Sequence, residues 1–290
     1  MSDNPHHDEV TGVDTTGHDW DGIKELNNPL PRWWLWCFYI TIVWGIGYTI
    51  AYPAWPLVQG ATAGVLGFST RGEVAEDIAA VEAQNAEVSA RLASADLSTL
   101  AITDPAHQYG VAGGAAVFRA NCSQCHGSGA AGVQAAGYPN LLDDAWLWGG
   151  SLEAIEYTVR HGIRNEQDFD ARWSEMPAYE EVFAEDEIAS IAEYVVSLSG
   201  QDHDAAAAAV GMELFAGECS SCHGDGGMGD PELGAPNLTD AIWLYGGSRD
   251  KIIETITYSR FGVMPAWGLR LSEAEIKAVT LYVHQLGGGE

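Results

Sequence analysis

The sequence contains the pentapeptide Cys-x-x-Cys-His twice, at residues 122–126 and 219–223. Two thiols at this spacing can each form a thioether to a haem edge, and the imidazole that follows then lies beneath the iron. Zinc sites and redox-active thiol pairs also use Cys-x-x-Cys, but they do not require the histidine. The motifs therefore predict two covalently bound haem c groups. The expected attachment points are Cys122, Cys125, Cys219 and Cys222, and the expected proximal iron ligands are His126 and His223.

Each motif opens a longer segment, and the two segments repeat one another. Pro-Asn-Leu at 139–141 recurs 97 positions later at 236–238. Further on the shift is 88 positions, because Met-Pro-Ala at 176–178 matches 264–266. The difference of nine residues falls within the polar run 161–175. The sequence thus predicts two copies of one small haem domain, the first with a longer loop before its methionine.

Each copy contains three helical signals. The first leads into the motif, at 115–120 and 211–215, and the second begins at Ser151 or Ser248, both suitable N-caps. The third is an amphipathic helix near the end of each copy, with apolar residues at i, i+3, i+7 and i+10. These residues are Ile188, Ile191, Val195 and Leu198, matched by Ile276, Val279, Val283 and Leu286. This order of a helix, a loop and two further helices around one prosthetic group indicates a small all-α domain of the class I cytochrome c type.

A haem that only carries electrons needs a second axial ligand, for which methionine and histidine are the main choices. Met176 and Met264 occupy matching Met-Pro-Ala loops, and we expect them to be the distal ligands. Met212 and Met228 lie too close to the second motif to reach the other face of its haem.

His161 and His284 are rival ligands, but neither recurs in the other copy, so a structural or surface role is favoured for both. The pairing of methionine with haem stays open. The pairs are either His126 with Met176 and His223 with Met264, or the crossed combination, since the loop tips are nearly identical and the first loop is longer.

Residues 33–52 contain no charge over twenty positions, which at about 1.5 Å per residue spans a hydrocarbon core of about 30 Å. Trp33 and Tyr52 begin and end the run as interfacial aromatic residues. A cleaved signal peptide would not begin after 32 polar residues. We therefore expect one retained transmembrane helix.

The expected fold is all-α, with one N-terminal transmembrane helix followed by two tandem class I cytochrome c domains. Residues 1–28 lack apolar periodicity and are expected to be mostly disordered. The expected segments are a polar N-terminal part at 1–32, the membrane helix at 33–52, a collar, surface helix and linker at 53–107, cytochrome c domains at 108–200 and 209–290, and a linker at 201–208 between them.

The charge is strongly acidic, with 13 Lys and Arg against 41 Asp and Glu, for a net charge of −28. Nucleic-acid binding is excluded, because contact with phosphates requires basic residues. An acidic surface permits docking of a basic protein partner, although general solvation or salt adaptation explains it equally well.

The chain resembles the membrane-anchored dihaem subunit, subunit III, of cbb3-type cytochrome c oxidases. The resemblance rests on Gly-Ile-Lys-Glu-Leu-Asn-Asn-Pro-Leu-Pro at 22–31, the Trp55-Pro56 pair after the apolar run, and the tandem haem motifs with their Met-Pro-Ala loops. It also makes the crossed pairing of methionine and haem a real alternative.

This resemblance implies an electron relay within a proton-pumping oxidase, with no oxygen-reducing site in this chain. The implied partners are a donor cytochrome c, a monohaem cytochrome c subunit and the catalytic haem-copper subunit. The location is the bacterial inner membrane, with both haem domains in the periplasm, where haem c is attached. Candidates for the haem crevice wall, which can equally be ordinary core, are Trp146, Trp243, Tyr138, Asn140 and Asn237.

Two other functions are compatible with the motifs. A free-standing anchored dihaem carrier would transfer electrons without an oxidase. A dihaem peroxidase would need one haem with an open iron site, and two matching Met-Pro-Ala loops argue against it.

Overall fold

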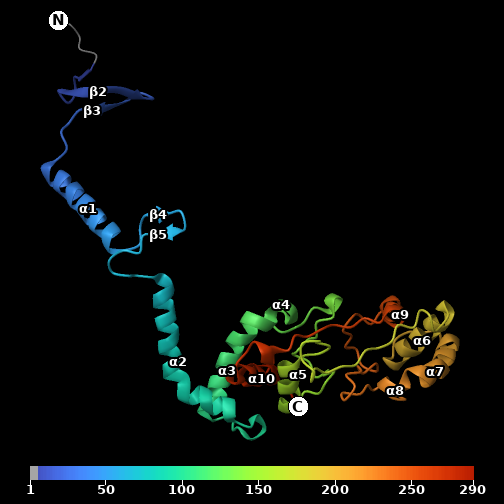
Figure 1. Cartoon of the computed structure of the whole chain (residues 1–290). Coiled ribbons are helices and arrows are strands. Elements are labelled where there is room, and N and C mark those ends of the chain that lie inside the picture. Colours follow the sequence, from blue (N-terminus) through green and yellow to red (C-terminus); the bar gives the residue numbers. More distant parts are fainter. Residues whose placement is uncertain (1–5) are drawn as a thin grey trace. The chain divides into compact units, whose positions relative to one another are not determined.

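The computed structural model describes residues 6–290, which form two compact units divided between Ala83 and Gln84 (Figure 1). The first unit contains two small sheets and one long apolar helix. The second unit contains both Cys-x-x-Cys-His motifs and is built from helices and the loops between them.

The first unit begins with a three-stranded antiparallel sheet in the order β1 (His7–Asp8), β2 (Val13–Trp20), β3 (Ile23–Leu26). Asp21 and Gly22 connect β2 to β3 with φ values of 53° and 90°, as in a two-residue hairpin turn. The expectation of disorder at 1–28 is therefore wrong for 7–26, since this turn pairs two strands without apolar periodicity. Residues 1–5 of that expectation lie outside the described part of the chain.

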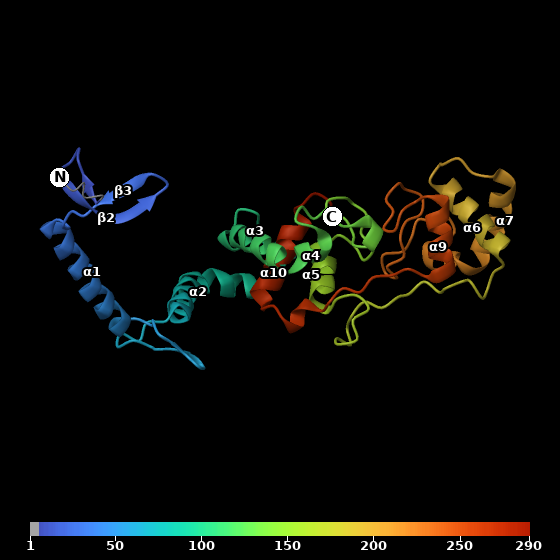
Figure 2. The same cartoon turned by 90° about the horizontal axis from the view of Figure 1, so that it is seen from above.

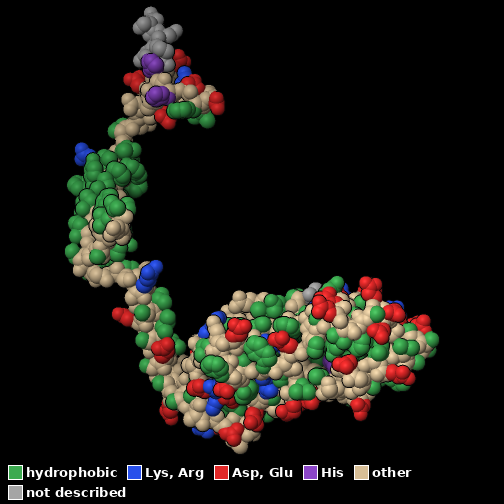
Figure 3. All heavy atoms as spheres, turned by 45° about the vertical axis from the view of Figure 1, so that its right-hand side comes forward, with side chains coloured by type: hydrophobic (Ala, Val, Ile, Leu, Met, Phe, Trp, Pro, Cys, Tyr) green, Lys and Arg blue, Asp and Glu red, His purple; other side chains and the backbone are tan. Residues whose placement is uncertain are grey.

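The predicted membrane helix is present as α1 (Arg32–Ala51). It has a mean hydropathy of 1.4 over its most apolar window and no buried residue, so it is long and apolar enough to cross a membrane. Figure 3 shows hydrophobic side chains covering its surface. A hairpin of β4 (Pro56–Leu57) and β5 (Gly60–Ala61) follows, and then α2 (Thr70–Ser94).

The second unit consists of two lobes, and each lobe combines segments from both sequence repeats (Figures 1 and 2). The first lobe contains α3 (Pro105–Val117), the π-helical turn η2 (Phe118–Cys122), α4 (Ser123–His126), α5 (Leu152–His161), η4 (Trp267–Leu269) and α10 (Glu273–His284). The short turn η3 (Gln134–Ala136) follows α4, and the side chain of Gln134 donates to the carbonyl of Trp243. The second lobe contains α6 (Glu185–Leu198), α7 (Ala205–Glu218), α8 (Ser220–His223) and α9 (Arg249–Tyr258). A short turn, η1 (Leu97–Thr99), precedes α3.

The C-terminal helices of the repeats are thus exchanged: α10 packs on α3 and α5, whereas α6 packs on α7 and α9. The apolar face of α10 surrounds Phe118, and the matching face of α6 surrounds Phe215. Because the two faces carry the same residue spacing, either helix offers similar packing to either lobe. The all-α fold with two tandem cytochrome c domains is confirmed, but the ranges 108–200 and 209–290 describe repeats in sequence rather than the lobes in space.

A buried glycine lies at each of these helix crossings. A Cβ atom at Gly114 in α3 would lie 2.0 Å from the carbonyl oxygen of Ala278 in α10. Its equivalent 97 positions later, Gly211 in α7, would place a Cβ 1.9 Å from the carbonyl oxygen of Ser190 in α6. Only glycine allows the backbones to approach this closely.

Gly114→Ala should therefore destabilise the first lobe, since the added methyl group overlaps the backbone of α10. We expect the free energy of unfolding to fall by about 1–3 kcal/mol, as for other overpacked sites, in thermal or denaturant unfolding of the purified protein. Gly113→Ala is the matched control, because nothing lies within 4 Å of a Cβ there. That variant should be neutral, or stabilised by up to about 1 kcal/mol through helix propensity. Equal stabilities of the two variants would contradict the close crossing.

Candidate haem-binding sites

Two mainly apolar cavities, one in each lobe, contain the residues of the two motifs. The first cavity, of about 110 Å³, is lined by Cys122, His126 and Met264 among other residues. The second cavity, of about 200 Å³, is lined by Cys219, Cys222, His223 and Met176. Cys125 is partly buried in α4, and it is not among the described residues that line the first cavity.

The methionine in each cavity comes from the other repeat. Met264 lies with His126, and Met176 lies with His223. Of the two pairings left open by the sequence, the crossed one is the pairing that places histidine and methionine in the same cavity of the described structure.

The loop that carries Met264 is bound to the end of α5. The N–H of Ile163 donates to the carbonyl of Met264, and the N–H of Met264 donates to the carbonyl of Ile163, both at 3.0 Å. Gly162 precedes this pair with φ of 76°, and a Cβ there would lie 2.4 Å from the carbonyl oxygen of Met264. A residue without a side chain therefore lets the methionine loop lie against the first lobe.

The loop that carries Met176 is bound to the end of α9, but by different hydrogen bonds. The hydroxyl of Ser259 donates to the carbonyl of Met176, and the N–H of Tyr179 donates to the carbonyl of Ile256 at 3.1 Å. Ser259 is the counterpart of Gly162 and also has a positive φ, of 55°. Each methionine is thus held by the helix that follows the motif of the opposite repeat.

The two motif histidines have the same hydrogen bond. Nδ1 of His126 lies 3.2 Å from the carbonyl oxygen of Pro139, and Nδ1 of His223 lies 3.1 Å from that of Pro236. An Nδ1–H that donates to a carbonyl leaves the lone pair of Nε2 available for a metal. Burial lowers the pKa of both imidazoles, while the bond to the proline carbonyl acts in the opposite direction. Both rings are thus favoured in the neutral form that binds iron.

Two of the four motif thiols, those of Cys122 and Cys219, are unlike the activated thiol of a redox-active pair. Burial, with a smaller contribution from neighbouring groups, raises the pKa of Cys122 and Cys219 to about 11. A redox-active Cys-x-x-Cys instead has a thiol of lowered pKa in an electropositive setting. The fifth cysteine, Cys37, is exposed on α1.

Four of the five candidates for the crevice wall line a cavity. Trp146 and Asn140 line the first cavity, and Trp243 and Asn237 line the second. Tyr138 is 37 % exposed and is not among the described residues that line either one.

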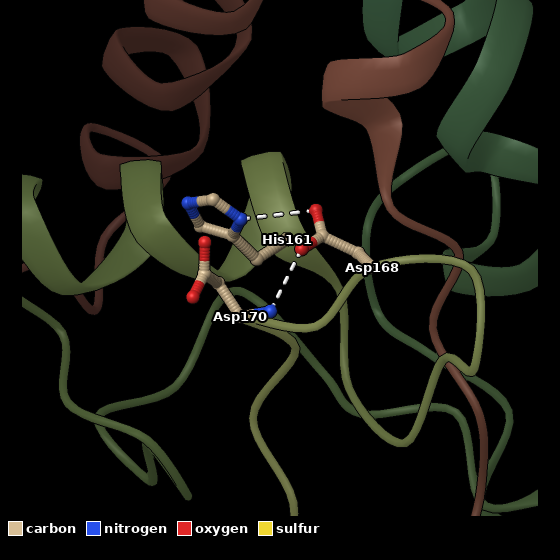
Figure 4. A group of neighbouring side chains, drawn as sticks. All are labelled: His161, Asp168 and Asp170. Atoms are coloured by element: carbon tan, nitrogen blue, oxygen red, sulfur yellow. Dashed lines mark hydrogen bonds and ion pairs between the residues drawn. The ribbon is translucent and has the colours of Figure 1, made fainter.

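The rival histidines lie elsewhere among the described residues. His161 is hydrogen-bonded through Nδ1 to Asp168 at 3.0 Å, with Asp170 beside it (Figure 4). His284 lies 2.9 Å from the backbone carbonyl oxygen of Glu290. The structural or surface role predicted for both agrees with these contacts. Met212 and Met228 are exposed by 50 % and 65 %, respectively.

Several residues that shape the cavities were not predicted from the sequence. Trp148 lines the first cavity at 8 % exposure, and its indole N–H has no hydrogen-bond partner among the described residues. Leu147 lines both cavities, so it forms part of the wall between them. The 97-residue correspondence could have found Trp148, since its counterpart Tyr245 is also aromatic and lines the second cavity.

Comparison with known proteins agrees with this geometry. The family model described as the N-terminal domain of cytochrome oxidase-cbb3, FixP, matches residues 12–59. The model described as cytochrome c oxidase, cbb3-type, subunit III matches residues 110–195 and 206–283. The chain belongs to the family of subunit III of cbb3-type cytochrome c oxidases.

Individual members of the subunit III family are similar over nearly their whole length. The chain is 58 % identical to the cbb3-type cytochrome c oxidase subunit CcoP of Cereibacter sphaeroides, over 95 % of each chain. It is 50 % identical to subunit FixP of Azorhizobium caulinodans, over 98 % of each chain. It is also 50 % identical to subunit CcoP of Rhodobacter capsulatus, over 96 % of this chain and 97 % of that one.

Cytochrome c domains bind haem c, and the two cavities fit this group. Each combines at least one attachment thiol, an imidazole favoured in the neutral form, a thioether and mainly apolar walls. The unpartnered N–H of Trp148 offers a donor that a bound group can satisfy.

Gly162→Ala tests how the Met264 loop is held. The methyl group would overlap the Met264 carbonyl, and alanine is strained at φ of 76°. We expect the loop to move and the thioether to leave the iron in the first cavity alone. About half of the sulfur–iron charge-transfer absorbance of the haem-loaded protein should then be lost. Gly129→Ala, where nothing lies within 4 Å of a Cβ, is the control and should retain the full band. An unchanged band in Gly162→Ala would contradict this role of the glycine.

Proposed function

We propose that the chain is a membrane-anchored dihaem electron-transfer subunit of a cbb3-type cytochrome c oxidase. The observation that carries the proposal is that each cavity is lined by at least one cysteine of its motif, the motif histidine and a methionine, in a chain of this family. Iron with two protein ligands has no open position for a substrate, so the chain serves as a relay and oxygen reduction belongs to another subunit.

In this proposal each haem c is held by residues from both repeats. Cys122 and Cys125 attach one haem, and Cys219 and Cys222 attach the other. Bound haem supplies a reversible one-electron exchange at its iron. His126 with Met264, and His223 with Met176, would be the axial ligands. The bonds from Nδ1 to the proline carbonyls orient the imidazoles, and the apolar walls exclude water and so tune the potential.

The proposed location is the bacterial inner membrane, with α1 as a single membrane-spanning helix and both lobes in the periplasm, where haem c is attached. The proposed partners are the catalytic haem-copper subunit, a monohaem cytochrome c subunit and a donor cytochrome c. Acidic side chains are spread over the visible face of the second unit in Figure 3, which favours a basic donor. Proton pumping would be a property of the assembled oxidase.

The two alternatives are less well supported. A dihaem peroxidase requires an open or displaceable iron site, whereas both cavities contain a methionine. A free-standing carrier does not explain the match of residues 12–59 to the N-terminal domain of the oxidase subunit.

Purification of the tagged chain from its native membrane tests the function. We expect a copper-containing complex that includes a haem-copper subunit and a monohaem cytochrome c, and that consumes oxygen when a reduced cytochrome c is supplied. Haem staining after denaturing electrophoresis, together with a haem assay, should give two covalent haems per chain. Recovery of the chain alone, or a haem-to-chain ratio near one, would argue against the proposal.

The crossed ligation can be tested in a chain with a single haem. Replacing Cys122 and Cys125 by serine leaves the haem at His223 as the remaining one. We expect Met176→Ala in this background to abolish the sulfur–iron band, because that thioether lies in the second cavity. Met264→Ala should leave the band in place.

The reciprocal background, with Cys219 and Cys222 replaced by serine, should give the opposite pattern. Ligation within each repeat predicts the reverse result in both backgrounds.

A further inference from the structure

Arg164 is a partly buried cation that lines the second cavity, although it belongs to the first repeat. It lies within 161–175, the segment that contains the nine extra residues, and its backbone has a positive φ of 50°. A non-glycine residue in this conformation is uncommon and is held there by its surroundings.

Backbone carbonyls and an aromatic ring hold the guanidinium in place. Nε donates to the carbonyl of Gly262 at 2.7 Å, and Nη1 donates to the carbonyl of Ser174 at 2.6 Å. The group also stacks over Phe261, 5.4 Å from the ring centroid. These contacts fix the position of the cation between the two methionine loops without neutralising its charge.

No carboxylate among residues 6–290 lies within ion-pair distance of Arg164, and its Nη2 donates no hydrogen bond to a described acceptor. Burial lowers the pKa of this guanidinium, while Tyr245 and Glu175 oppose the shift from a greater distance. A partly buried charge without a counter-ion is costly, so Arg164 can accept an anion in this cavity.

The haem expected in this cavity carries two propionate side chains, and guanidinium groups bind carboxylates through strong charge-assisted hydrogen bonds. We propose that Arg164 binds a propionate carboxylate of the haem attached at Cys219 and Cys222. This inference rests on the proposed function, which places that haem in the second cavity.

Arg164 differs in this respect from Arg260, the other arginine in the second cavity, because Nη1 of Arg260 lies 3.3 Å from a carboxylate oxygen of Glu254. Arg260 stacks on Tyr245 and donates to the hydroxyl of Thr255. Arg172 makes the equivalent contacts in the first lobe, stacking on Trp148 and donating to Thr158. Each lobe thus has one arginine stacked on an aromatic ring.

The counterpart of Arg164 in the 97-residue register is Phe261, and no Arg or Lys is among the described residues that line the first cavity. The second haem alone therefore receives this additional cation. A positive charge near the carboxylate stabilises the reduced iron relative to the oxidised iron, so Arg164 raises the potential of the second haem.

Spectroelectrochemical titration of the haem-loaded full-length chain tests the inference. In Arg164→Gln, one of the two midpoint potentials should fall, with a threefold to tenfold smaller equilibrium constant for reduction; tenfold corresponds to about 59 mV. The other potential should stay unchanged. Arg164→Lys should retain most of the potential, since it keeps the charge. Arg270→Gln changes the net charge equally at an exposed site outside both cavities, so it should move neither potential.

The same substitution in a Met264→Ala background identifies the haem that responds. The first haem then lacks its methionine and is spectrally distinct, and the shift should appear in the haem that keeps its sulfur–iron band. Unchanged potentials in Arg164→Gln would show that the arginine serves only to connect the loops.

Loss of the sulfur–iron band in Arg164→Gln would equally overturn the inference, because the arginine would then act by holding the Met176 loop through Ser174. Failure of the proposed function is distinguishable from both outcomes, since it would appear before any titration as a haem-to-chain ratio other than two or as recovery of the chain without other oxidase subunits.

Discussion

The close packing of each C-terminal helix on the opposite repeat determines the arrangement of both cavities. Met176 precedes α6 by nine residues, and Met264 precedes α10 by nine. A methionine connected so closely to a helix has to lie in the lobe on which that helix packs. The glycine crossings at Gly114 and Gly211 therefore fix the helices, and the helices place the thioethers.

The pseudo-symmetry of the lobes makes their differences informative. Both lobes contain the motif and a proline carbonyl that accepts from its histidine. Both also contain an arginine stacked on an aromatic ring. The run 161–175 is longer by nine residues than its counterpart, and Arg164 within it lines the cavity of the other lobe. Two haems in almost identical surroundings would have similar potentials, so a single additional cation beside one of them is enough to separate them.

The local features could be predicted from the sequence, since the motifs, the Met-Pro-Ala loops and the amphipathic helices are each encoded within a few residues. The exchange of helices could not be predicted, because α6 and α10 present the same apolar spacing to either lobe. The N-terminal sheet could not be predicted from apolar periodicity, because its strands have none. The sequence indicates the hairpin only through the Asp21-Gly22 turn. Arg164 was missed because a polar run was interpreted only as a loop, and its burial depends on contacts with residues almost a hundred positions away.

The exchange also has a consequence for the order in which the protein matures. A ribosome completes the first motif long before α10, yet the first lobe needs Met264 and α10 for its cavity. The second lobe has all its helices once α9 has been made. The lobe whose synthesis begins first is therefore finished last, and haem would be attached at Cys122 while its covering helix is still missing. A chain that ended between Gly262 and Met264 would keep every described residue that lines the second cavity, and would lose the methionine and α10 of the first.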